Sequence, residues 1–200
     1  MTLITMPSTP NFTTSEWGIR RNTVVSESPF TGAQQIISYD KAQWYCSVTL
    51  PAMKRSQAAA WHSFFLKLRG RENTFLMGDP DATTPTGSTS DHPASVVTSA
   101  SAAISDTSLL LTIGAGKKLN AGTYLQTGTA SAAKLYMVVD DNTGNGAVTI
   151  EPKLKAAVPN LETIIFNDAK GVFRMDSNDL TWSANQISTY GISFSCSEAL

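Results

Sequence analysis

Residues 33–50, AQQIISYDKAQWYCSVTL, end in a regular alternation of apolar and polar positions. In the second half of this segment, every other position carries a large apolar side chain: Trp44, Cys46, Val48 and Leu50. A period of two predicts a β-strand with one buried face and one exposed face. Pro51 has no amide hydrogen to donate to a neighbouring strand, so we expect the strand to end before it.

A helical period follows between Ser56 and Gly70. Four large apolar residues fall at i, i+3, i+4 and i+7: Trp61, Phe64, Phe65 and Leu68. This spacing predicts a helix with one apolar stripe, for which Ser56 is a candidate N-cap and Gly70 a candidate C′ residue. A helix of about 20 Å is not stable alone in water, so its stripe should be buried against a sheet. Leu66 points away from the stripe and is either a lone exposed leucine or part of a subunit contact.

The pattern changes after a short predicted strand, NTFLM, and the turn that ends at Pro80. Residues 81–95, DATTPTGSTSDHPAS, contain almost no large apolar side chain and predict a linker or long loop. Residues 96–155 then hold four short strand candidates: SLLLTI, TYLQT, KLYMVV and AVTIEP. Their spacing of about ten residues is typical of a small barrel or sandwich. The pair Asn145-Gly146 predicts a tight hairpin turn.

Longer alternating segments return in residues 160–200: ETIIFN, GVFRM, TWSA and QISTYGISFSCSEAL. One face of the last segment carries Tyr190, Ile192, Phe194 and Cys196. We expect this face to pack on the helix stripe, beside the strand of Trp44, so that both chain ends form one sheet. The sequence thus predicts a mainly β protein. Its first domain is split between residues 1–80 and 161–200, and residues 81–160, with the 81–95 linker, form an inserted module.

Composition narrows the function classes. The 200 residues are 42% hydrophobic and 16% charged, with a net charge of −1. Nucleic-acid and anionic-membrane binders usually carry a basic face, so we expect neither a membrane nor a specific nucleic acid as partner. No apolar run reaches the length of a membrane helix, and the N-terminus lacks the features of a signal peptide. Cys46 and Cys196 have no metal-ligand spacing and are predicted to be buried free thiols, which suits a reducing compartment.

Two glycine-rich segments match known ligand loops only in part. IGAGKK at 113–118 lacks the spacing of a phosphate-binding loop, and Lys118 stands where Ser or Thr would hold the metal. DDNTGNGAVTIE at 140–151 has oxygen-bearing residues at the first, third and last positions of a calcium loop. Gly144 and Asn145 do not suit the positions between them. We expect turns between strands, with a weak metal site as the lesser alternative for the second segment.

Candidate catalytic groups are sparse. The only histidines are His62 and His92, and neither has a Ser, Cys or Asp partner in a recognisable arrangement. Most aspartates stand beside Gly, Pro, Ser, Asn or another Asp, which is typical of turns. We therefore predict that the chain is not an enzyme, with no catalytic, cofactor-binding or metal-binding residues and no cofactor.

Residues 28–80, SPFTGAQQIISYDKAQWYCSVTLPAMKRSQAAAWHSFFLKLRGRENTFLMGDP, resemble the N-terminal part of distal tail proteins of long-tailed bacteriophages. The segment LNAGTYLQTGTASAAKLYMVVDDNTGNGAVTIEPKL resembles their inserted module. The match covers most of the chain but not residues 1–27, and RENTF after Gly70 replaces an expected glycine-containing turn. The resemblance implies a split β-sandwich ring domain with one short helix, plus a small inserted barrel of the oligonucleotide/oligosaccharide-binding type.

The same resemblance implies a structural virion protein, a ring adaptor that joins the tail tube to the tip or hub. Its expected partners are its own copies, in a hexameric ring, the tail tube protein, the hub or tip protein and the tape measure protein. It would be made in the host cytoplasm and reside at the tail tip. Leu66, the 81–95 loop and residues 1–27, considered as an N-terminal arm, are candidate contacts. A receptor-binding or carbohydrate-binding tail component is the main alternative, and a small cell-wall hydrolase is a further one.

Overall fold

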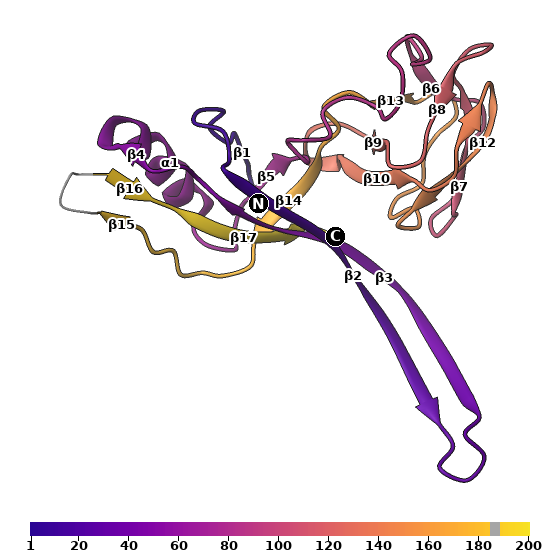
Figure 1. Ribbon diagram of the computed structural model, residues 1–200, viewed down its shortest axis with the longest axis horizontal. Helices are drawn as coiled ribbons and strands as arrows, with labels where there is room; N and C mark the ends of the chain where they lie inside the picture. Colours follow the sequence, from indigo (N-terminus) through magenta and orange to yellow (C-terminus); the bar gives the residue numbers. More distant parts are fainter. Residues whose placement is uncertain (185–188) are drawn as a thin grey trace.

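The structure is a computed structural model that describes residues 1–184 and 189–200 (Figure 1). The chain is mainly β, with 44% of residues in strands and 9% in helices. Two six-stranded sheets dominate, and one α-helix is found in the part of the chain that the structure describes. Figure 1 shows the two sheets at opposite ends of the upper part of the view, with a long two-stranded ribbon extending away from both.

The first sheet has the strand order β1-β5-β14-β17-β3-β2. Its strands are β1 (Leu3–Ile4), β2 (Thr14–Glu27), β3 (Gln34–Thr49), β5 (Thr74–Met77), β14 (Gly171–Met175) and β17 (Ser193–Glu198). All neighbours are antiparallel except β1 and β5. Strand β17 lies between β3 and β14, so the prediction that both chain ends build one sheet is confirmed.

Residues 1–27 are not an unpaired arm. Strand β1 pairs with β5, and β2 pairs with β3 along its whole length from Thr14 to Glu27. Trp17 of β2 is half-buried, and its ring meets Phe173 edge-on with centroids 5.4 Å apart. The N-terminal segment is therefore part of the first sheet in the monomer.

The second sheet has the order β13-β6-β7-β12-β10-β9 and is nearly closed into a barrel. Its strands are β6 (Val96–Thr98), β7 (Ser108–Thr112), β9 (Tyr124–Thr127), β10 (Lys134–Val138), β12 (Gly146–Glu151) and β13 (Thr163–Ile164). A bridge between Gln126 and Ile165 connects the two edge strands. This sheet extends past residue 160, the boundary expected from the sequence, and Phe166 still belongs to its core.

Short elements complete the fold. A three-stranded sheet holds β4 (Met53–Lys54), β15 (Ser183–Ala184) and β16 (Thr189–Gly191), and a two-stranded sheet holds β8 (Lys118–Leu119) and β11 (Asn142–Thr143). A 3₁₀ turn, η1, spans Ala130–Ala132. The long C-terminal strand expected from the sequence is interrupted at Ile192, and its residues 186–188 lie outside the described residues.

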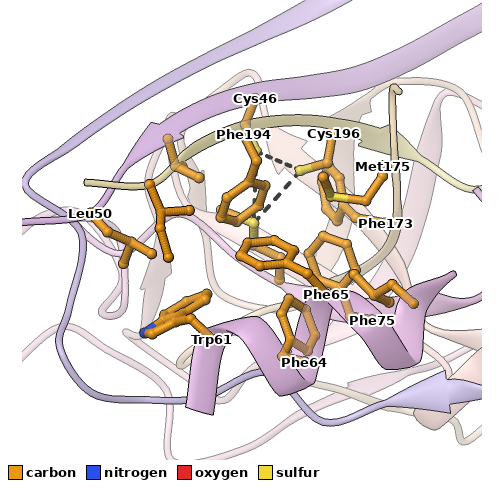
Figure 2. Packing of buried hydrophobic residues seen from close by; sticks show 14 of the residues in the cluster. Cys46, Leu50, Trp61, Phe64, Phe65, Phe75, Phe173, Met175, Phe194 and Cys196 are labelled. Carbon is orange, nitrogen blue, oxygen red and sulfur yellow. Dashed lines mark hydrogen bonds between the residues drawn. The ribbon is translucent and has the colours of Figure 1, made fainter. Parts of the chain in front are cut away.

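Helix α1 (Arg55–Leu68) covers one face of the first sheet (Figure 2). Its predicted stripe is confirmed, because all four members are buried: Trp61, Phe64, Phe65 and Leu68. The N-cap prediction is wrong. Lys54 holds the N-cap position without a side-chain hydrogen bond, and Ser56 lies inside the helix. Strand β4 pairs Lys54 with Thr189, so the chain leaves an extended strand and enters the helix two residues earlier than expected.

Phe194 is central to the core beneath the helix. Its ring centroid lies 5.1 Å from that of Phe65 and 6.2 Å from that of Trp61. On the side of the rings that lies away from the helix, Cys46 and Cys196 face each other across β3 and β17 with their Sγ atoms 3.0 Å apart (Figure 2). Both are buried free thiols, as predicted.

Two loop predictions need correction. Asn145-Gly146 does not close a tight hairpin, because β11 lies between β10 and β12 and pairs with β8. The Asn145 side chain instead accepts hydrogen bonds from the amides of Ile113 and Gly114 at 2.9 and 3.0 Å. Residues 81–95 contain no strand, as expected, but they are not a free linker: the Thr86 hydroxyl, for example, donates to the carbonyl of Ala121 at 2.9 Å.

Candidate interaction surfaces

The first partial ligand motif, residues 113–118, forms a turn between β7 and β8. Gly114 and Gly116 adopt positive φ angles of 98° and 71° between β7 and β8, and the two lysines that follow are bound elsewhere. Lys117 donates to the carbonyl of Ser90, and Lys118 forms an ion pair with Asp91 at 3.0 Å. These lysines connect the 81–95 segment to β8 and to the turn before it, so both amino groups are bound by that segment.

Two side chains of the calcium-like segment, Asn142 and Glu151, contact other residues of the chain, and the Asn142 Oδ1 atom is buried without a partner among the described residues. Asn142 donates to the carbonyl of Ala147, while Glu151 forms an ion pair with Arg21 at 3.3 Å. Within residues 1–184 and 189–200, no cluster of three or more His, Cys, Asp or Glu side chains is arranged to hold a metal ion. Among the helices described, none combines the length and apolar character of a membrane span.

The histidines occupy different surroundings. His62 lies on the flank of α1, where its ring stacks near Trp182 at 4.3 Å and meets Tyr190 at 5.6 Å. His92 belongs to the 81–95 segment. The Nε2 atoms of both are buried and have no hydrogen-bond partner among the described residues. The ring of His62 also lines the groove along α1 that is described below.

The most exposed apolar surface is the ribbon, defined as residues 22–39 at the far ends of β2 and β3 (Figure 1). A bulge between Arg21 and Asn22 marks its root, and six residues on each strand pair beyond it. At about 3.3 Å per residue, the ribbon projects roughly 20 Å from the sheet. Its exposed apolar side chains are Val24, Val25, Phe30, Ile36, Ile37 and Tyr39. Since adjacent residues of a strand face opposite sides, both faces of the ribbon are apolar and uncovered.

The tip of the ribbon is well defined. The amide of Ser28 donates to the carbonyl of Ala33, and the amide of Gly32 donates back to the carbonyl of Ser28, both at 2.9 Å. Gly32 adopts φ +67°, which this turn requires. Phe30 is 94% exposed at the tip. Glu27 accepts a hydrogen bond from Gln34 and is the one charged residue of the ribbon.

A groove runs along the outer side of α1. It comprises two adjoining hollows of about 650 and 350 Å³ that share Leu66, Arg69 and Trp182. The larger hollow is also lined by Arg55, His62 and Lys67. Leu66 is 69% exposed, which confirms that it points away from the core.

The groove carries an excess of positive charge. Arg69 forms an exposed ion pair with Glu72 at 3.6 Å. The side chains of Arg55 and Lys67 have no partner among the residues that the structure describes. The groove therefore combines two unpaired cations with an exposed leucine and an exposed tryptophan.

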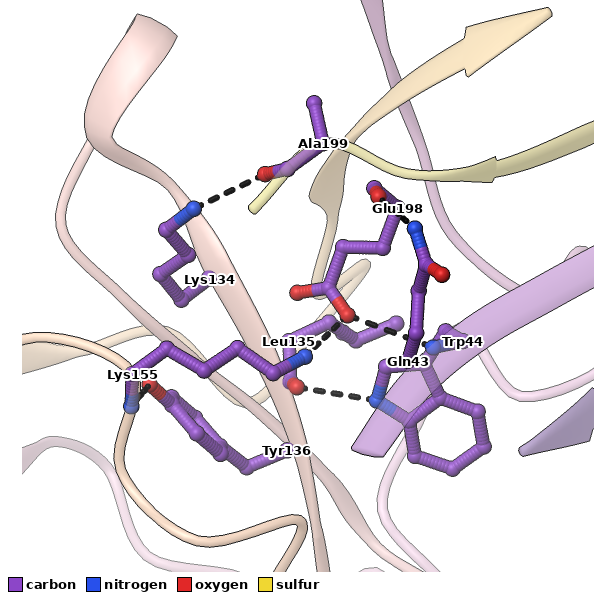
Figure 3. A network of polar contacts seen from close by, with 8 residues as sticks. All are labelled: Gln43, Trp44, Lys134, Leu135, Tyr136, Lys155, Glu198 and Ala199. Atoms are coloured by element: carbon purple, nitrogen blue, oxygen red, sulfur yellow. Dashed lines mark hydrogen bonds and ion pairs between the residues drawn. The ribbon is translucent and has the colours of Figure 1, made fainter. Parts of the chain in front are cut away.

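A polar network connects the two sheets at their junction (Figure 3). Glu198 of β17 forms an ion pair with Lys155, and the same carboxylate accepts a hydrogen bond from the amide of Trp44. The side chain of Glu198 is fully buried and that of Lys155 is 10% exposed. Burial lowers the pKa of Lys155, and the negative charge of Glu198 opposes this shift. The Trp44 indole donates to the carbonyl of Leu135 at 2.9 Å and extends the network to β10.

Two exposed ion pairs link the second sheet to the root of the ribbon. Glu151 meets Arg21 on β2, and Lys153 meets Asp40 on β3 at 2.6 Å. This contact lowers the pKa of Asp40, mainly through the hydrogen bond from Lys153. These two contacts connect the ribbon root to the end of β12 and to the segment that follows it.

The ribbon and the groove were largely missed by sequence reasoning. Val24-Val25 and Ile36-Ile37 are adjacent pairs, and such pairs place one apolar side chain on each face of a strand. That signal was available, but it also fits a strand buried on both faces. Leu66 was the only groove residue named in advance as a contact.

Comparison with protein-family models finds no family that matches the chain, and comparison with curated proteins finds no match either.

Proposed function

We propose that this chain is a structural virion protein, a ring-forming adaptor at the distal end of a long bacteriophage tail. The observation that carries the proposal is the ribbon of residues 22–39. A two-stranded ribbon is marginally stable in water, and this one exposes apolar side chains on both faces. Large exposed apolar surfaces mark sites where another protein binds.

The proposed architecture is a split β-sandwich ring domain with an inserted barrel of the oligonucleotide/oligosaccharide-binding type. In support, β3 and β17 pair across most of the chain length, and the nearly closed second sheet is formed by a continuous segment between them. The ion pair of Lys155 and Glu198 joins the two parts. An adaptor needs such rigidity, because one part must hold its neighbours while the other points away from them.

In this role, copies of the chain bind one another around an axis, in a ring of six. One side of the ring meets the tail tube protein and the other meets the hub or tip protein, with the tape measure protein as a further partner. The chain itself performs no catalysis and binds no membrane or specific nucleic acid. It is made in the bacterial cytoplasm and incorporated at the tail tip.

The test is the solution mass across a concentration series, by light scattering, together with negative-stain electron microscopy. Six copies of 21.4 kDa would have a mass of about 128 kDa, and the particles should be annular. Closed assemblies of another copy number would revise the stoichiometry. A chain that stays monomeric at all concentrations would count against the ring.

A ribbon-less variant provides the matched control. Replacing residues 24–37 by Asn-Gly joins Thr23 to Ser38, which are register partners, through a two-residue turn. No buried residue is lost, so the thermal midpoint of the monomer should change little. Assembly should be abolished. An assembly that forms without the ribbon would remove the observation on which the proposal depends.

A further inference from the structure

We propose that the tip of the ribbon, residues 27–33, binds in the α1 groove of a second copy of this chain. This inference rests on the proposed function, because it names one contact between neighbouring copies in the ring. Phe30 would enter the groove beside Leu66 and Trp182. Glu27 would meet the unpaired cations Arg55 and Lys67.

The shape of the tip suits insertion. Its backbone hydrogen bonds between Ser28, Gly32 and Ala33 fix the turn before binding, so little conformational entropy is lost on docking. Phe30 is almost fully exposed, and its ring contacts no other aromatic ring in the part of the chain that the structure describes. A rigid turn that presents one aromatic side chain is typical of an interface anchor.

The groove offers complementary chemistry. Leu66 and Trp182 provide exposed apolar surface, and Arg55 and Lys67 provide positive charge without a partner among residues 1–184 and 189–200. The ribbon carries a single charge, the carboxylate of Glu27. His62 also lines the larger hollow of the groove.

The geometry selects a second copy as the occupant. Figure 1 shows the ribbon tip and α1 at opposite ends of the molecule, so the tip does not reach the groove of its own chain. Tip and groove are different surfaces of one protomer. A contact between them is therefore heterologous, and repetition of a heterologous contact gives a ring when the rotation closes.

The experiment measures the association of the full chain by sedimentation velocity over a concentration series. Phe30→Ser and Leu66→Ser each change an exposed side chain, so the monomer should keep its thermal midpoint. Each substitution should weaken association at least tenfold, since one apolar contact is lost from the interface. Ile104→Ser is the matched control, because Ile104 is 62% exposed and belongs to neither surface. It should leave association unchanged.

Charge reversal tests the pairing itself. Glu27→Lys and Lys67→Glu should each weaken association, while the double variant should associate more tightly than either single variant. A purely apolar contact would show no such recovery and would overturn the assigned role of Glu27.

The outcomes separate this contact from the ring. If the wild-type chain forms an oligomer and none of the four substitutions weakens its association, the proposed contact is overturned and the proposed ring is not. A wild-type chain that is monomeric throughout would overturn both. If the four substitutions leave association unchanged and an acidic oligosaccharide quenches the fluorescence of Trp182, the groove binds saccharide instead of the tip.

Discussion

The ion pair between Lys155 and Glu198 should contribute strongly to stability, because both partners are buried at the junction of the two sheets. Lys155→Met removes the positive charge and keeps most of the side-chain volume. It leaves the Glu198 carboxylate in the interior with only the amide of Trp44 as a partner. Removing one member of a buried ion pair destabilises a protein by about 3–5 kcal/mol.

The expected loss follows from the burial of the partner that remains. Glu198 has no exposed side-chain surface, so water does not replace Lys155 without opening the junction. For a chain of this size, each kcal/mol corresponds to a shift of about 2–4 °C in the thermal midpoint. Lys155→Met should therefore unfold at a markedly lower temperature and urea concentration than the wild type.

The double variant Lys155→Met, Glu198→Met distinguishes an unpaired charge from a general packing defect. With both charges removed, most of the lost stability should return, because replacing a buried pair by apolar residues is often neutral. Lys153→Met is the control, since its partner Asp40 is exposed, and it should have no measurable effect. The reasoning fails if Lys155→Met unfolds like the wild type or if the double variant is as unstable as the single one.

Three further predictions address the core, the thiols and the pH dependence. Phe65→Ala should lower the free energy of unfolding in urea by about 3–5 kcal/mol, because Phe65 is buried in the core. Ser56→Ala should change it little, because Ser56 lies inside the helix and does not cap it. Equal effects of the two substitutions would contradict the described packing. Refolding with oxidised glutathione should join Cys46 to Cys196, seen as a mass loss of two hydrogens, and closing so long a loop should stabilise by about 5 kcal/mol. Burial, with Asp79 nearby, raises the pKa of Tyr124, so the unfolded state loses this proton first and stability should fall above about pH 10. In Tyr124→Phe, the thermal midpoint should fall less steeply with rising pH than in the wild type. The same dependence on pH in both proteins would refute this assignment.

Local patterns predicted the elements whose burial is decided by a single nearby surface. The stripe of α1 and the alternation from Trp44 to Leu50 were read correctly, since each has one apolar face and one partner layer. Ser56 failed as a cap because the preceding residues pair with β16, and this long-range pairing determines where the helix begins. Asn145 failed as a hairpin residue because its side chain binds the turn after β7. In both cases, a contact distant in sequence outweighed a local preference.

The surfaces on which the proposed function depends were harder to predict for a different reason. Lys155 and Glu198 are 43 residues apart, and no local pattern connects them. The apolar pairs of the ribbon resemble a buried strand, and in the monomer nothing covers them. A sequence reflects the residues that are buried after assembly as well as those buried in one chain. A partner is therefore expected where a cluster of apolar residues is exposed in the single chain.

The root of the ribbon connects these surfaces mechanically. Arg21 and Asp40 lie at the bulge where the ribbon leaves the sheet. Arg21 pairs with Glu151, the last residue of β12, and Asp40 pairs with Lys153, which follows β12. Deeper in, Trp44 of the same strand binds the carbonyl of Leu135 on β10. A neighbour that holds the ribbon therefore also constrains the direction of the barrel-like sheet. In a ring, this coupling would orient every inserted module alike, which an adaptor between a tube and a tip requires.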